Sequence, residues 1–142
     1  MDILNAYWRM EYVTSQEDGD KGMESPFRAL PELGDDRKAL IIHRARHHYL
    51  VLNRYPYNPG HLLVVPFREV AEMEALSPDE RLELMDLLVL SQDLLRRAMK
   101  PDGFNIGFNL GRASGAGIPR HLHGHVVPRW TGDTMTPSIR RR

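Results

Sequence analysis

Three histidines alternate with other residues near the C-terminal end of the chain, as His121, His123 and His125. In a β-strand, residues at positions i, i+2 and i+4 point to the same face. An extended segment would carry three imidazoles on one side and turn Leu122 and Val126 toward the other, where a core could receive them. Because the unperturbed pKa of histidine lies near neutral pH, an imidazole can act as base, acid or nucleophile. The spacing therefore predicts reactive side chains along one face of a strand.

A metal site and a catalytic site make different demands on such a row. Zinc needs histidine nitrogens about 2.0–2.1 Å away. Along a strand, neighbouring histidines of the row are roughly 6.8 Å apart and the outer two roughly 13.6 Å apart. All three rings could reach one ion only with strain, and no second motif marks His61 or Asp133 as a further ligand. In nucleophilic or acid–base catalysis the rings serve different targets. We therefore expect catalysis and no metal site.

A glycine-rich loop, residues 111–117, comes directly before the histidine row. Glycine allows a close backbone approach, and successive amide N–H groups can form a concave site for an anion. Arg112 adds a positive charge to this loop, and Asn109 adds a neutral amide just before it. Such a loop is often only a turn, but next to a row of histidines it indicates that the electrophile is a phosphate.

Composition narrows the class of protein. The chain has 142 residues, of which 42% are hydrophobic and 27% charged, as in a soluble globular protein of one domain. Its 19 Lys and Arg balance 19 Asp and Glu, which argues against a general nucleic-acid-binding protein. The absence of cysteine excludes disulfides and thiolate catalysis. No apolar run reaches membrane-spanning length and the N-terminus lacks a signal-peptide pattern, so we expect a cytoplasmic protein with no membrane partner.

The elements that must position the histidines are short apolar runs and one long helix. Ser77 is a candidate N-cap, followed by Pro78 and by Glu80 three residues after the cap, which predicts a helix to about Met99. The predicted buried stripe of this helix is Leu84, Leu87, Leu88, Leu94, Leu95 and Ala98, and the predicted strands are residues 39–43, 49–53, 61–66, 104–110 and 121–127. The order β-β-β-α-β-β favours an α+β fold, an antiparallel sheet with the helix on one face.

Three segments differ in composition. Residues 1–37 combine an aromatic-rich start with polar and glycine-containing stretches, which indicates an N-terminal arm and loop. Residues 38–135 contain the predicted strands and helix and form the expected domain. Residues 136–142 end in three arginines and are interpreted as a basic, solvated C-terminal tail.

The sequence resembles the histidine triad (HIT) superfamily of nucleotide hydrolases and transferases. The HIT signature, His-apolar-His-apolar-His-apolar-apolar, matches residues 121–127, with Gly124 as the one small substitution. Residues 52–66 and 125–133 are similar to segments of the fragile histidine triad branch, and residues 8–12 to the arm of bacterial diadenosine tetraphosphate phosphorylases or hydrolases. The resemblance implies a five-stranded antiparallel sheet with a long helix and a short helix on one face, and a homodimer in which two sheets join.

The resemblance also implies a role for each histidine. His123, which matches the middle histidine of the signature, would attack the α-phosphorus and form a nucleotidyl-histidine intermediate. His125 would contact the phosphate or the departing oxygen, and His121 would orient the nucleophile. His61 would support the site from the third strand.

The nucleotide-binding residues follow from the same resemblance. Asn53 is similar to the residue that holds the ribose, Leu52 would line the base pocket, and Asn109 would reach the phosphates. Many members carry Gln and Ser or Thr where this chain has Gly117 and Ile118, so we expect backbone contacts to phosphate there. The predicted binding residues are Leu52, Asn53, Asn109, Gly115, Gly117 and Ile118.

Together these features predict a nucleotidyl hydrolase or transferase that acts on dinucleoside polyphosphates such as diadenosine tetraphosphate. Water as acceptor gives hydrolysis and inorganic phosphate gives phosphorolysis, and both stay open. No metal is required in the covalent step, although such substrates often arrive bound to Mg²⁺. A nucleotide-binding regulatory protein with little catalysis, or a metal-binding module, are the alternative hypotheses.

Overall fold

The computed structural model describes residues 25–133. The predicted N-terminal arm up to residue 24, including the family-like residues 8–12, and the predicted basic tail of residues 136–142 lie outside the described residues.

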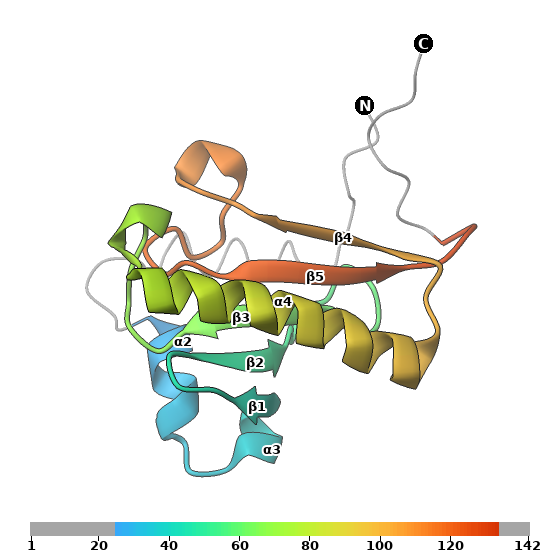
Figure 1. Cartoon of the computed structure of the whole chain (residues 1–142), viewed down its shortest axis with the longest axis horizontal. Helices are drawn as coiled ribbons and strands as arrows, with labels where there is room; N and C mark the ends of the chain where they lie inside the picture. The colour runs from blue at the N-terminus through green and yellow to red at the C-terminus, as the bar shows by residue number, and fades with distance from the viewer. Residues whose placement is uncertain (1–24, 134–142) are drawn as a thin grey trace.

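A single five-stranded antiparallel sheet forms the centre of the fold (Figure 1). The strand order is β1-β2-β3-β5-β4, so β5 lies between β3 and β4, and β1 and β4 form the two edges. The predicted α+β fold is confirmed, with strands β1 (Ile41–Arg44), β2 (His48–Leu52), β3 (Leu62–Pro66), β4 (Gly103–Phe108) and β5 (Gly124–Arg129).

The long helix α4 (Pro78–Met99) covers one face of the sheet. It begins where the sequence predicts, because Ser77 and Glu80 form a reciprocal capping box. Leu84, Leu87, Leu88 and Leu95 are buried against the sheet, and Leu94 is half-buried. Ala98 is exposed, which makes its place in the predicted stripe wrong. Met99 packs in the last turn instead, close to the backbone of Gly60.

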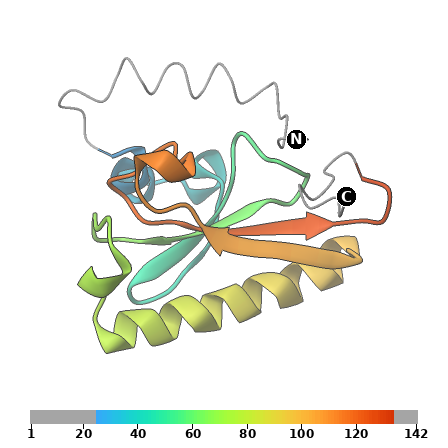
Figure 2. The same cartoon turned by 90° about the horizontal axis from the view of Figure 1, so that it is seen from above.

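The opposite face carries two short helices, α2 (Pro26–Ala29) and α3 (Asp36–Ala39), joined by the 3-10 helix η2 (Leu30–Glu32) (Figure 2). The resemblance implied a short helix on the same face as the long one. On the face that α4 covers, the short helical element is the 3-10 helix η3 (Met73–Ala75), which leads into α4. The second core cluster joins Phe27 of α2 to alternate residues of β2 and β3, and Leu30 packs against it, so the first part of the predicted N-terminal loop is packed on the sheet.

The strand that carries the histidines is shorter than predicted, because β5 begins at Gly124. His121 and His123 precede it, so the prediction of three histidines within one strand is wrong. The reason is tertiary: the amide of Leu122 donates to the Val70 carbonyl instead of joining the ladder with β3. The alternation of faces nevertheless holds, since Leu122 and Val126 both pack into the α4 core.

Candidate active site

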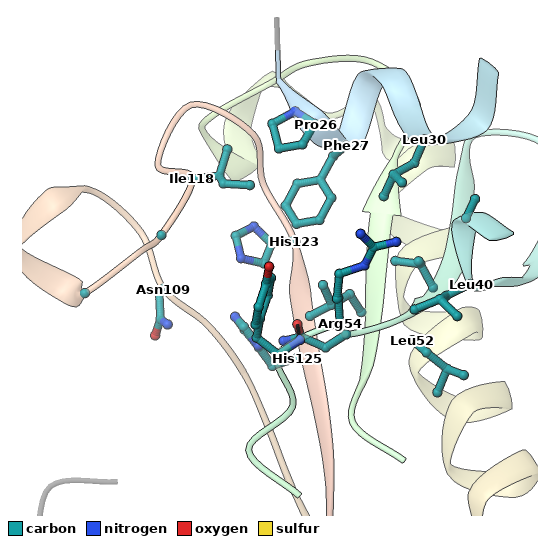
Figure 3. A pocket seen from close by; sticks show the side chains of 17 residues that line it. Pro26, Phe27, Leu30, Leu40, Leu52, Arg54, Asn109, Ile118, His123 and His125 are labelled. Atoms are coloured by element: carbon teal, nitrogen blue, oxygen red, sulfur yellow. Dashed lines mark hydrogen bonds between the residues drawn. The ribbon is translucent and has the colours of Figure 1, made fainter. Parts of the chain in front are cut away.

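A pocket of about 230 Å³ opens on the sheet face that carries α2 and α3 (Figure 3). All six residues predicted to bind nucleotide line it, as do two of the four predicted catalytic histidines: Leu52, Asn53, Asn109, Gly115, Gly117, Ile118, His123 and His125. His121 and His61 are both buried behind the lining, where they contact its histidines. The structure therefore brings the predicted site residues together.

Sequence reasoning missed the part of the lining that comes from α2, η2 and the residue after α3. Pro26, Phe27, Leu30 and Leu40 form an apolar wall there. A local signal for α2 existed, because Pro26 follows a serine as it does at helix starts, and Phe27 and Leu30 have the i, i+3 spacing of one helix face. No local signal shows that this helix packs over the histidines.

His121 is fully buried and both of its ring nitrogens have partners. Its Nε2 lies 2.8 Å from the carbonyl oxygen of Pro66, and its Nδ1 lies 2.8 Å from Oγ of Ser25. Because a carbonyl only accepts, Nε2 carries the proton and Nδ1 accepts from the Ser25 hydroxyl. Burial lowers the pKa of His121, although the bond to Pro66 opposes this. His121 is therefore a neutral, locked side chain.

His123 takes its tautomer from the backbone of His121. Its Nδ1 lies 2.8 Å from the His121 carbonyl oxygen, so Nδ1 carries the proton and Nε2 carries the lone pair. The Phe27 ring packs 4.9 Å from the His123 ring between centroids, which restricts its rotation. His123 lines the pocket, and an imidazole whose Nδ1 carries the proton offers the lone pair of Nε2 as a nucleophile.

His61 and His125 form a second pair, in which the ring proton is on Nε2 and not on Nδ1 as in His123. The amide of Tyr57 donates to His61 Nδ1 over 3.1 Å, so the proton of His61 is on Nε2. This Nε2 donates to His125 Nδ1 over 2.9 Å, which puts the proton of His125 on its own Nε2. The rings of His123 and His125 are 4.9 Å apart between centroids. The pocket thus has a nucleophilic nitrogen beside a proton donor.

Asn53 helps to hold this pair. Its Oδ1 accepts from the Tyr55 amide over 3.0 Å, which fixes the amide group so that Nδ2 points to His61 Nδ1 at 3.4 Å. The Tyr57 ring stacks on His61, with ring centroids 5.3 Å apart and an interplanar angle of 18°. The β2–β3 loop thus positions His61 as well as lining the pocket.

The same loop is fastened to the far end of β5 through Asn58. The Asn58 side-chain amide donates to the Pro128 carbonyl and to Asp133, each over 3.0 Å, and the backbone carbonyl of Asn58 accepts from the His61 amide. Asp133 also receives two bonds of 2.8 Å from Arg129. Burial alone would raise the pKa of Asp133, but Arg129, the Trp130 amide and Asn58 lower it to about 2. This ionised cluster keeps the loop against β5.

The glycine-rich loop lies across the pocket from Leu40 and Leu52. It contains the 3-10 helix η4 (Arg112–Ser114), and Gly111 and Gly115 have positive φ angles of 73° and 82°, which glycine adopts without strain. In Figure 3, Asn109 and Ile118 lie on one side of His123, and Leu40 and Leu52 on the other. The pocket therefore has a polar, backbone-rich end and an apolar end.

Among residues 25–133, no cluster of three or more His, Asp or Glu side chains is arranged to hold a metal ion. No helix in this part of the chain has the length and apolar character needed to cross a membrane.

A family model described as HIT domain matches residues 35–132. The chain belongs to the HIT domain family. The HIT match begins at residue 35 and ends at residue 132, where the sequence placed the domain at 38–135. Two histidines of the signature, His123 and His125, line the pocket.

Relatives and solved structures agree with the HIT assignment. The chain is 41% identical over 140 residues to AP-4-A phosphorylase of Mycobacterium tuberculosis, an alignment that covers 93% of this chain and 71% of that protein. It is 30% identical over 93 residues to the asymmetrical bis(5'-nucleosyl)-tetraphosphatase of Schizosaccharomyces pombe, covering 66% of this chain and 50% of that one. A hypothetical histidine triad nucleotide-binding protein from Sulfolobus tokodaii superposes with a TM-score of 0.67 at 26% identity, over 83% of this chain and 78% of that chain.

Proposed function

We propose that this HIT protein transfers a nucleotidyl group from a dinucleoside polyphosphate to inorganic phosphate or water. The observation that carries the proposal is the pair of complementary tautomers in one pocket, with the lone pair of His123 on Nε2 and the proton of His125 on Nε2. The names of the relatives support the substrate class, since one is an AP-4-A phosphorylase and another a bis(5'-nucleosyl)-tetraphosphatase.

The first chemical step assigns each histidine a task. Nε2 of His123 attacks the α-phosphorus, and the P–O bond to the remaining polyphosphate breaks. The departing oxygen takes the proton of His125 Nε2, and His61 supports His125 from the other nitrogen. Positive charge develops on the His123 ring. The His121 carbonyl stabilises this charge, because it accepts a hydrogen bond from Nδ1–H of His123.

The second step reverses the roles. An oxygen of inorganic phosphate, or water, attacks the phosphorus of the nucleotidyl-histidine and the P–N bond breaks. His125, now deprotonated at Nε2, accepts the proton of the attacking group. Diadenosine tetraphosphate gives ATP in the first step, and then ADP with phosphate or AMP with water.

The pocket divides between the parts of the nucleotide. The base fits the apolar end that includes Leu52, the ribose lies near Asn53, and the phosphates meet the backbone of Gly115, Gly117 and Ile118 together with Asn109. Mg²⁺ enters with the polyphosphate chain of the substrate and takes no part in the bond to His123. The 41% identity to an AP-4-A phosphorylase favours phosphate over water as the acceptor.

Product analysis with diadenosine tetraphosphate tests this function. We expect ADP and ATP in the presence of inorganic phosphate and no turnover by the His123→Ala variant, whose binding of AMP should persist. AMP and ATP formed independently of phosphate would assign hydrolysis. Nucleotide binding without turnover under either condition would favour the regulatory protein instead.

We also propose a homodimer through β4 and the flank of α4. β4 is an edge strand, and Ile106 on it is 42% exposed. Leu82, Met85 and Val89 follow the spacing of one helical stripe and are 58–64% exposed. Arg96, farther along α4, packs over Phe104 of β4, so this flank of the helix adjoins the edge strand.

Unpaired edge strands and exposed apolar stripes favour association. Light scattering after size-exclusion chromatography should give twice the chain mass. The Val89→Glu variant should shift it toward the monomer, and the Arg97→Glu variant, on the same helix but outside the stripe, should not. A monomeric parent protein would contradict the dimer.

A further inference from the structure

Arg54 is the one cation other than histidine among the described residues that line the pocket. It follows Asn53 directly, at the beginning of the β2–β3 loop, and it is exposed. Other arginines of the described chain, such as Arg44, Arg68 and Arg129, bind carboxylates. No hydrogen bond or ion pair joins the Arg54 guanidinium to another described residue. A long cation is therefore available to a ligand at the pocket.

The position of Arg54 indicates which part of a nucleotide it meets. In Figure 3 its guanidinium lies toward Leu30 and Leu40, whereas Asn109 and Ile118 lie on the other side of His123. The glycine-rich loop, which suits phosphate, continues from Asn109 and Ile118. Arg54 therefore belongs to the apolar end of the pocket and not to the phosphate end.

The two sides of that apolar end differ in character. Val51 and Leu63 form its floor on the sheet and are buried, and Phe27 is buried as well, while Arg54 is exposed. A flat aromatic group placed between them would have hydrocarbon on one face and a guanidinium on the other. A guanidinium is planar and delocalised and stacks on aromatic faces, which the point charge of a lysine cannot do.

We infer that Arg54 closes the base pocket by stacking its guanidinium on the base of the transferred nucleotide, and that it favours purines over pyrimidines. The inference rests on the proposed function, because it takes the ligand to be a nucleotide. A purine offers the guanidinium two fused rings and a pyrimidine only one, so the larger base gains more from the same contact. Arg54 is thus a specificity-determining residue for the reaction.

Binding of adenosine, AMP and CMP to the whole chain, measured by calorimetry, separates a base contact from a phosphate contact. Stacking of one base on a protein side chain corresponds to a loss of about tenfold in affinity when it is removed. Arg54→Met keeps an unbranched side chain without the charge. It should weaken the binding of adenosine and of AMP by the same factor of about ten, and the binding of CMP by a smaller factor. Arg54→Lys should recover little of this loss. Arg97→Met, an exposed arginine on α4, is the matched control and should bind as the parent does.

Three results would overturn the inference: unchanged adenosine binding by Arg54→Met, a loss confined to AMP, or full recovery by Arg54→Lys. A loss confined to AMP would assign Arg54 to phosphate, and full recovery by Arg54→Lys would show that a positive charge suffices without stacking. Failure of the proposed function is distinguishable, because it would appear in the parent protein as an absence of turnover with diadenosine tetraphosphate. The adenosine measurement requires no turnover.

Discussion

Replacing Ser25 with alanine should destabilise the fold and disturb the nucleophile. The Ser25 hydroxyl and the His121 ring are both fully buried, and their hydrogen bond is 2.8 Å long. The other nitrogen of His121 is committed to Pro66, so the Nδ1 lone pair would lose its donor in a place that water does not reach. An unsatisfied buried acceptor costs about 1–3 kcal/mol. We expect the free energy of unfolding to fall by about this amount.

Urea unfolding followed by circular dichroism measures this loss as a lower midpoint at an unchanged m-value. Ser91→Ala is the matched control, because Ser91 is also fully buried but its hydroxyl donates to the Leu87 carbonyl, four residues earlier in α4. That carbonyl keeps its helical partner, so the control leaves no polar group unsatisfied and should differ little from the parent.

The same variant has a kinetic signature. The His121 carbonyl fixes the tautomer of His123, so loosening His121 should lower kcat more than it changes KM for diadenosine tetraphosphate. A Ser25→Ala protein whose stability differs from the parent by less than about 0.5 kcal/mol, the range of ordinary surface substitutions, would refute the reasoning.

Two other substitutions test the packing around the site. Asp133→Asn should lower the free energy of unfolding by about 2 kcal/mol at pH 7. The reason is that the folded carboxylate has a pKa of about 2, below the value near 4 in the unfolded chain, so its ionised form stabilises the fold above pH 4. Acid titration of both proteins should show this difference disappear as the pH falls from 4 toward 2, and a difference that persists at pH 2 would contradict it. Gly124→Ala would place its Cβ 2.9 Å from ring atoms of Phe108, so its melting temperature should fall. Gly107→Ala, with nothing within 4 Å of the added carbon, should melt like the parent, and equal melting of both variants would contradict the clash.

Local patterns predicted the elements that local chemistry determines. The start of α4 follows from Ser77 and Glu80, which satisfy each other's backbone groups within one turn. The faces of Leu122 and Val126 follow from alternation, which persists even where the ladder does not. The start of β5 at Gly124 did not follow, because it depends on the bond from Leu122 to a carbonyl far along the chain.

In the candidate site too, features set by neighbouring residues were predictable and features set by distant contacts were not. The histidines and the glycine-rich loop are close in sequence, so their motif indicated phosphate chemistry. The partner of His121 is 96 residues away, at Ser25, and the cover over His123 is Phe27. Such contacts form only when α2 packs on the sheet, and no pattern within residues 25–39 encodes that position. The apolar wall of the pocket and the locked tautomer therefore required the structure.

The stereochemical course at phosphorus tests the central claim, the nucleotidyl-histidine intermediate, most directly. A dinucleoside tetraphosphate with a single configuration at an α-thiophosphate is treated with the protein and inorganic phosphate, and the diastereomer of the ADP α-thio product is identified by phosphorus NMR. Each in-line displacement inverts the phosphorus. Attack by His123 followed by attack of phosphate predicts overall retention of configuration. Inversion would show a single direct displacement and would contradict the assignment of His123 as the nucleophile.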